Sequence, residues 1–117
     1  MSSIHNYSIK QILSDNNKCY LLTLEFDGFR KSFYIYNLES LQQKVIAIEY
    51  KHGFIDNPAP NKKSELTFHG KYVLNYNKDY KISFAIEGTV LNGNYLLIVP
   101  SWGRSVSHTL WVFFNTN

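Results

Sequence analysis

Residues 19–35 read CYLLTLEFDGFRKSFYI, two alternating segments separated by Asp27-Gly28. Apolar side chains occupy every second position of both segments, as in strands that bury one face. Asp-Gly between two such segments favours a two-residue type I′ turn, because both central residues need positive φ. The stretch therefore predicts a β-hairpin that turns at Asp27-Gly28.

The predicted turn also sets the register of this hairpin. One face then carries the pairs Phe26–Phe29, Leu22–Phe33 and Tyr20–Ile35, and the other carries Glu25–Arg30, Thr23–Ser32 and Leu21–Tyr34. The first face is apolar except for Lys31, opposite Leu24, whose aliphatic stem can lie along apolar surface. Because a one-residue slip would expose the whole apolar set, the turn and the pattern support the same register.

Short alternating segments continue along the chain. We expect further strands at residues 7–13, 45–51, 66–68, 72–76, 80–87, 95–99 and 106–114. The core faces of two of them are expected to carry Ile46, Ile48 and Tyr50 in one strand and Tyr80, Ile82, Phe84 and Ile86 in the other. Residues 52–64, with Gly53, Pro58 and Pro60, are expected to form a surface loop, and His69-Gly70 to separate two strands.

A second type I′ hairpin is predicted at Asn92-Gly93. Pairing across that turn places Ile86 opposite Val99, Gly88 opposite Leu97 and Val90 opposite Tyr95. The last segment is apolar on both faces, which favours a central strand over an edge strand.

The fold class follows from the number and spacing of these strands. The chain is 44% hydrophobic and 16% aromatic, and flat or β-branched side chains pack well on pleated surfaces. Eight or nine short strands predict an all-β protein, a two-sheet antiparallel β-sandwich in one domain over residues 1–117, with a partly closed β-barrel as the alternative.

Charge and cysteine content limit the partners. The net charge is +3 and the basic residues are dispersed apart from Lys62-Lys63, whereas nucleic-acid binders concentrate cations in a stripe, so nucleic acid is an unlikely ligand class. Cys19 is alone, so an intramolecular disulfide is excluded. The sequence shows no apolar signal-peptide core and no transmembrane run, which predicts cytoplasmic synthesis, with release by a non-classical route left open.

No motif in the sequence indicates catalysis. His5, His52, His69 and His108 lack the short spacings of zinc ligands, and the glycines are too isolated for a phosphate loop. Cys19 lies in a predicted strand, and carboxylates such as Glu49 are expected on solvent faces. We therefore expect no enzyme, no catalytic residue, no metal site and no cofactor.

Two groups of residues are candidates for binding. In the segment Pro100-Ser101-Trp102-Gly103-Arg104-Ser105, Trp102 could stack on a sugar ring or lie among lipid headgroups, and Arg104 could bind a carboxylate or phosphate, with Ser101 beside them. Alternatively, Trp102 folds back over the core and Arg104 is only solvated. Arg30, Tyr34 and Tyr36 form a second predicted platform on the outward hairpin face, unless the tyrosines face another sheet or a dimer partner.

These observations predict a non-enzymatic, lectin-like binding protein that recognises a cell-surface glycan or lipid headgroup, as small lectins and toxin binding components do. The alternative is a small inhibitor or immunity-type protein that blocks a partner protein. A homo-oligomer fits both functions. The identity of the ligand and the oligomeric state do not follow from the sequence.

Overall fold

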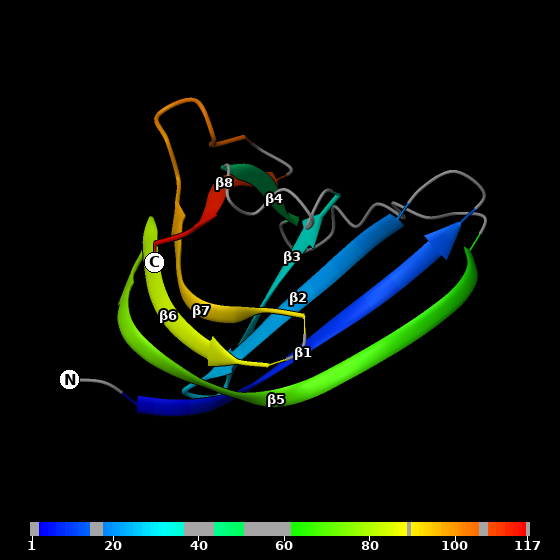
Figure 1. Cartoon of the computed structure of the whole chain (residues 1–117). Coiled ribbons are helices and arrows are strands. Elements are labelled where there is room, and N and C mark those ends of the chain that lie inside the picture. Colours follow the sequence, from blue (N-terminus) through cyan, green and yellow to red (C-terminus); the bar gives the residue numbers. More distant parts are fainter. Residues whose placement is uncertain are drawn as a thin grey trace.

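The computed structural model describes residues 3–14, 18–36, 44–50, 62–88, 90–105 and 108–116, and no helix occurs among them. The strands are β1 (Ser3–Ser14), β2 (Lys18–Phe26), β3 (Phe29–Ile35), β4 (Val45–Tyr50), β5 (Lys62–Lys78), β6 (Lys81–Glu87), β7 (Asn92–Ile98) and β8 (His108–Asn115). They form a closed antiparallel barrel in the order β1-β2-β3-β4-β8-β7-β6-β5, with β5 pairing back to β1 (Figure 1). The all-β prediction is confirmed, and the barrel weighed as an alternative is the architecture.

The first hairpin has the predicted register. All seven pairs between β2 and β3 agree with it, from Phe26 opposite Phe29 at the turn to Tyr20 opposite Ile35. Asp27 and Gly28 have φ values of 50° and 80°, as a type I′ turn requires. The Asp27-Gly28 turn and the alternating hydrophobic pattern together therefore specify the register of the β2–β3 hairpin.

The predicted register of the second hairpin is wrong. Phe84 pairs with Tyr95 and Ile86 with Gly93, so Asn92-Gly93 lies within β7 instead of forming the turn. The partner of Ile86 has moved by six residues from the expected Val99. A shift by an even number leaves every side chain on its predicted face, so a period-two pattern does not distinguish the two registers.

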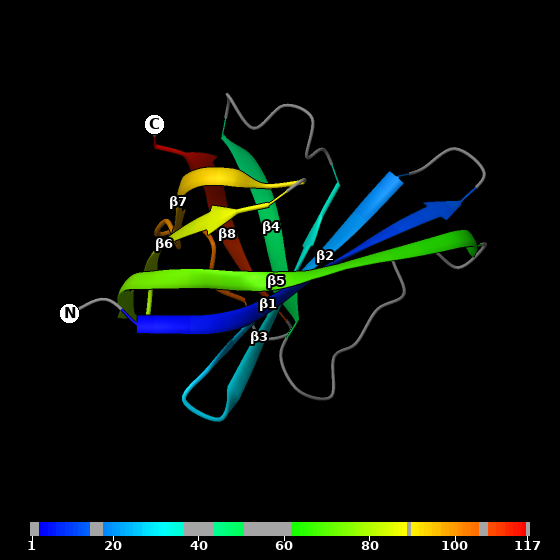
Figure 2. The same cartoon turned by 60° about the horizontal axis from the view of Figure 1, so that its bottom comes forward.

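Gly70 does not separate two strands, because β5 runs unbroken from Lys62 to Lys78, between β1 and β6 (Figure 2). Gly70 lies opposite Tyr7 of β1, and a Cβ there would be 2.7 Å from the Tyr7 ring atom Cε1. The missing side chain makes room for a ring. The strand also takes in residues 62–64 of the expected loop, and residues 52–61 of that loop lie outside the described residues.

The expected core face of β4 is also wrong. Ala47 is buried, whereas Ile46 is 40% exposed and points outward. Ala47 lies opposite Trp111 of β8, and the small methyl group leaves interior space for the large indole ring. The side chain of Tyr50 lies outside the described residues. Strand β8 pairs with both β4 and β7, as expected for a central strand.

Aromatic side chains fill the barrel interior. Phe84, Tyr95 and Phe113 stack with ring centroids 5.3–6.2 Å apart, and the rings of Phe33 and Trp111 are nearly perpendicular, with centroids 5.6 Å apart. A packed interior directs the search for a binding site to the outer surface. Within the described ranges, no helix has the length and apolarity needed to cross a membrane.

Candidate functional site

The segment from Pro100 to Ser105 forms a tight turn between β7 and β8. The Gly103 N–H donates to the Pro100 carbonyl at 2.9 Å, and the Leu110 N–H donates to the Gly103 carbonyl at 2.7 Å. Gly103 is buried, and a Cβ at this position would collide with the Leu110 carbonyl oxygen. The turn is therefore held closely against the start of β8.

This anchoring leaves Trp102 at the surface, where 60% of it is exposed. Ser101 is exposed beside it. The alternative in which Trp102 folds back to cover the core is wrong, because the buried Gly103 occupies the inward position of the turn instead. A large aromatic ring is thus presented to solvent on a constrained backbone.

Arg104 rests on Tyr80. The guanidinium carbon lies 4.2 Å from the centroid of the Tyr80 ring, and Nη1 donates to the Tyr80 hydroxyl at 3.4 Å. Tyr80 was expected in the core, but it is 47% exposed because it precedes β6 in the β5–β6 turn, beyond the end of the barrel. The Tyr80 carbonyl accepts from the Val99 N–H at 2.9 Å, which ties this turn to the end of β7.

Further aromatic and cationic side chains lie on the adjoining outer surface of β5 and β6. Lys81 pairs with Lys78 across the strands, and its Nζ lies 5.5 Å from the ring centroid of the exposed Tyr76. A hollow of about 520 Å³ is lined by Asn77, Lys78, Asp79, Tyr80, Lys81, Ile98 and Val99. We call the surface formed by Tyr76, Lys78, Tyr80, Lys81, Trp102 and Arg104 the aromatic–cation face.

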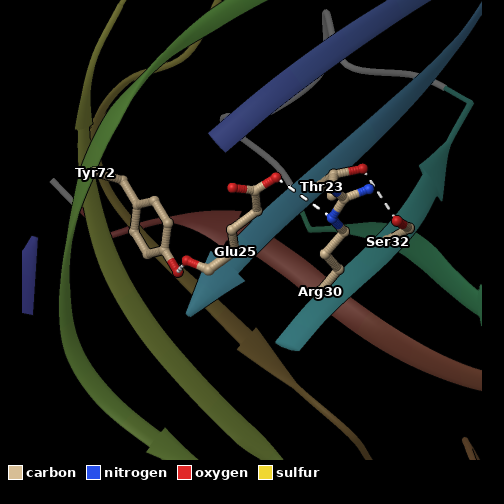
Figure 3. Close-up of polar contacts among 5 residues, drawn as sticks. All are labelled: Thr23, Glu25, Arg30, Ser32 and Tyr72. Carbon is tan, nitrogen blue, oxygen red and sulfur yellow. Dashed lines mark hydrogen bonds and ion pairs between the residues drawn. The ribbon is translucent and has the colours of Figure 1, made fainter. Parts of the chain in front are cut away.

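The second predicted platform is not one site. Arg30, Tyr34 and Tyr36 do share the outward face of β3, but Arg30 pairs with Glu25 of β2, with Nε 3.4 Å from Oε1 (Figure 3). Tyr34 is partly buried, and Tyr36, just beyond β3, is exposed. At about 3.3 Å per residue along a strand, Arg30 and Tyr36 are roughly 20 Å apart.

Glu49 is not on a solvent face as expected. Its side chain lies with Trp111 and Lys31: Trp111 Nε1 donates to Oε1 at 3.0 Å, and Lys31 Nζ lies 3.4 Å from Oε2. Lys31 Nζ is also 5.1 Å from the centroid of the Trp111 ring. These contacts satisfy the polar groups at one end of the barrel interior, and we assign them a structural role.

The buried thiol of Cys19 is 1% exposed and is poorly suited to nucleophilic attack. Burial raises its pKa to about 11, so the group is a neutral thiol near pH 7. In the part of the chain that the structure describes, no three His, Cys, Asp or Glu side chains are grouped to hold a metal ion. The aromatic–cation face instead offers flat rings and fixed positive charge.

The sequence matches no model of a protein family and shows no significant similarity to a curated protein.

Proposed function

We propose that this chain is a non-enzymatic binding protein whose aromatic–cation face recognises a glycan or lipid headgroup that carries a negative charge. The exposure of Trp102, on the same turn that holds Arg104 against Tyr80, carries the proposal. An indole ring offers a flat apolar surface with a polar edge, which suits the face of a sugar ring. A guanidinium group offers a fork of donors to a carboxylate or phosphate.

The contact between Arg104 and Tyr80 also favours binding by positioning the guanidinium group before a ligand arrives. Because its guanidinium group already lies on the Tyr80 ring, less side-chain freedom is lost when a ligand is bound. Lys78 and Lys81 add positive charge beside it, with Asp79 as the carboxylate of the adjoining hollow. Attraction to an anionic ligand should therefore weaken as salt is added.

Trp102→Ala is expected to weaken ligand binding by about tenfold or more, because a stacked tryptophan is a typical hot spot. A glycan array and liposomes with neutral or anionic headgroups would identify the ligand class. Titration calorimetry or liposome sedimentation would then compare the variant with the wild type. Binding to the glycan array but not to the liposomes would identify a glycan, and binding to the liposomes alone would identify a lipid headgroup.

Leu66→Ala is the control, since Leu66 is 57% exposed and lies outside the aromatic–cation face. It should bind the same ligand with wild-type affinity. Undiminished binding by Trp102→Ala, or an equal loss in both variants, would contradict the proposed site.

A second candidate function, the blocking of a partner protein, is favoured by the outer surface of β4, β8 and β7. Ile46, Val112 and Ile98 lie side by side in the strand registers, and all three point outward. Lys81 continues this row on β6, and Lys44 lies over the Phe114 ring at 5.2 Å. An apolar centre with lysines beside it suits a partner protein with an apolar patch and an acidic rim.

Ile46→Lys is expected to weaken such a complex about thirtyfold or more, because it places a charge in the apolar centre of the interface. The measurement is the affinity for a stoichiometric partner purified from the native host, with Trp102→Ala as the control that retains binding. Sedimentation of the isolated chain as a dimer that Ile46→Lys dissociates would instead assign this surface to a second copy.

A further inference from the structure

A second hollow lies on the outer face of the neighbouring strands β5, β1, β2 and β3 and shares no residue with the aromatic–cation face. Its volume is about 640 Å³, within the range of small-molecule sites. It is lined by Asn6, Tyr7, Ser8, Lys10, Leu21, Thr23, Glu25, Arg30, His69, Gly70 and Lys71. The lining is mostly polar, and its cationic side chains outnumber its carboxylates.

Arg30 is only partly engaged by its carboxylate partner. The ion pair joins Nε of Arg30 to Oε1 of Glu25 at 3.4 Å, at the edge of the β2–β3 hairpin (Figure 3). Of the five donors of a guanidinium group, those on the two terminal nitrogens have no acceptor among the described residues. This is the fork that binds two oxygens of one anion.

Lys71 is held by a neutral group. Its Nζ donates to the side-chain oxygen of Asn6 at 2.7 Å, and Asn6 and Lys71 are register partners on β1 and β5. No carboxylate in the described ranges forms an ion pair with Lys71, whereas Lys10 is 3.3 Å from Glu65. The positive charge of Lys71 is therefore available to a ligand.

Arg30 and Lys71 lie where two hollows meet. A neighbouring hollow of about 360 Å³ at the tip of the β2–β3 hairpin shares Asn6, Glu25, Arg30 and Lys71 with the larger one. Ile4 and Phe29, both more than 60% exposed, line only the smaller hollow, as do His5 and the carboxylate of Asp27. A charged group at the junction would thus have the polar larger hollow on one side, and on the other the exposed side chains of Ile4 and Phe29 beside the carboxylate of Asp27.

The strands around this junction are fixed from inside the barrel. The Tyr72 hydroxyl of β5 donates to the Glu25 carbonyl of β2 at 2.9 Å and so links strands on either side of β1 (Figure 3). Burial raises the pKa of Tyr72, and the carboxylates of Asp27 and Glu25 raise it further, so the hydroxyl stays a donor. The backbone at Glu25 is therefore held in place. The ion pair with Glu25 in turn positions Arg30.

We propose that this junction is a second binding site, separate from the aromatic–cation face, for a tetrahedral oxyanion such as a phosphate or sulfate ester. The terminal nitrogens of Arg30 bind two oxygens of the anion, and the ammonium group of Lys71 on β5 binds a third. Ile4 and Phe29 contact an apolar group esterified to the anion. Glu25 weakens binding of the anion because its carboxylate competes for Arg30, and the carboxylate of Asp27 in the smaller hollow also repels the anion.

Titration of the labelled protein with inorganic phosphate, inorganic sulfate and phenyl phosphate, followed by amide NMR shifts at low salt, tests the site. Saturable shifts are expected around Asn6, Glu25, Arg30 and Lys71, with phenyl phosphate bound more tightly than inorganic phosphate. Arg30→Gln combined with Lys71→Gln should weaken binding at least about tenfold. Glu25→Gln should strengthen it, because a competing negative charge is removed.

Lys44→Gln is the matched control for Lys71→Gln alone, since it removes one positive charge on the other side of the barrel, beside Phe114. It should leave the shifts around Arg30 and Lys71 unchanged, as should Trp102→Ala. The side chains of Arg30 and Lys71 are exposed, so their substitution leaves the core intact. Equal weakening by Lys44→Gln, weaker binding by Glu25→Gln, or the absence of saturable shifts around Arg30 and Lys71 would overturn the proposal.

Discussion

Trp111→Ala is expected to lower the free energy of unfolding by about 3–5 kcal/mol, the usual cost of deleting a large buried aromatic side chain. Trp111 is 1% exposed and packs nearly perpendicular to the ring of Phe33. Its loss also removes the donor to Glu49 and the ring beneath Lys31, so two charged groups lose a partner inside the barrel. Urea unfolding followed by circular dichroism measures the change.

Trp102→Ala is the control for this experiment, because it deletes the same side chain from the surface. It is expected to change the free energy of unfolding by no more than about 0.5 kcal/mol. A similar loss of stability in both variants would show that Trp102 is packed in solution. That outcome would also remove Trp102 from the proposed binding face.

Gly70→Val is expected to lower the free energy of unfolding by about 1–3 kcal/mol, as overpacking of a filled core does. The direction of this change is informative, because replacing glycine with valine at an ordinary strand position raises the free energy of unfolding. Here the new Cβ would lie 2.7 Å from Cε1 of Tyr7, whose hydroxyl oxygen is also 2.5 Å from the site of a Cβ at Gly88. The Tyr7 ring is thus confined by two glycines and has little room to move.

A double-mutant cycle with Tyr7→Leu tests that cause. Removing the ring opens space beside Gly70, so Gly70→Val should cost less in the Tyr7→Leu background than in the wild type. Thermal or urea unfolding of the four proteins gives the coupling. An equal loss of unfolding free energy in both backgrounds would mean that glycine is required at position 70 by the backbone conformation and not by contact with the Tyr7 ring.

The candidate sites were only partly predictable from the sequence. Trp102 and Arg104 could be chosen because they share one short segment between apolar strands. Tyr80 was missed because it continues the alternation of β6, and only its position in the turn places it outside the core. Arg30 was chosen, but its partner Lys71 comes close only because β1 pairs with β5 on one side and β2 on the other.

The sequence by itself determined the all-β class, the first hairpin with its register, and the inward set of side chains in β2, β3, β6 and β7. These features follow from local alternation and from a turn that needs positive φ at two adjacent residues. Only the tertiary structure decided that the sheet closes into a barrel, which residues of β6 and β7 face each other, and that Gly70 accommodates a ring. Closure depends on hydrogen bonds and packing between strands that are distant in the sequence, such as β1 and β5. An alternating pattern predicts which face of the sheet a side chain lies on, but it does not predict which residue lies opposite on the neighbouring strand.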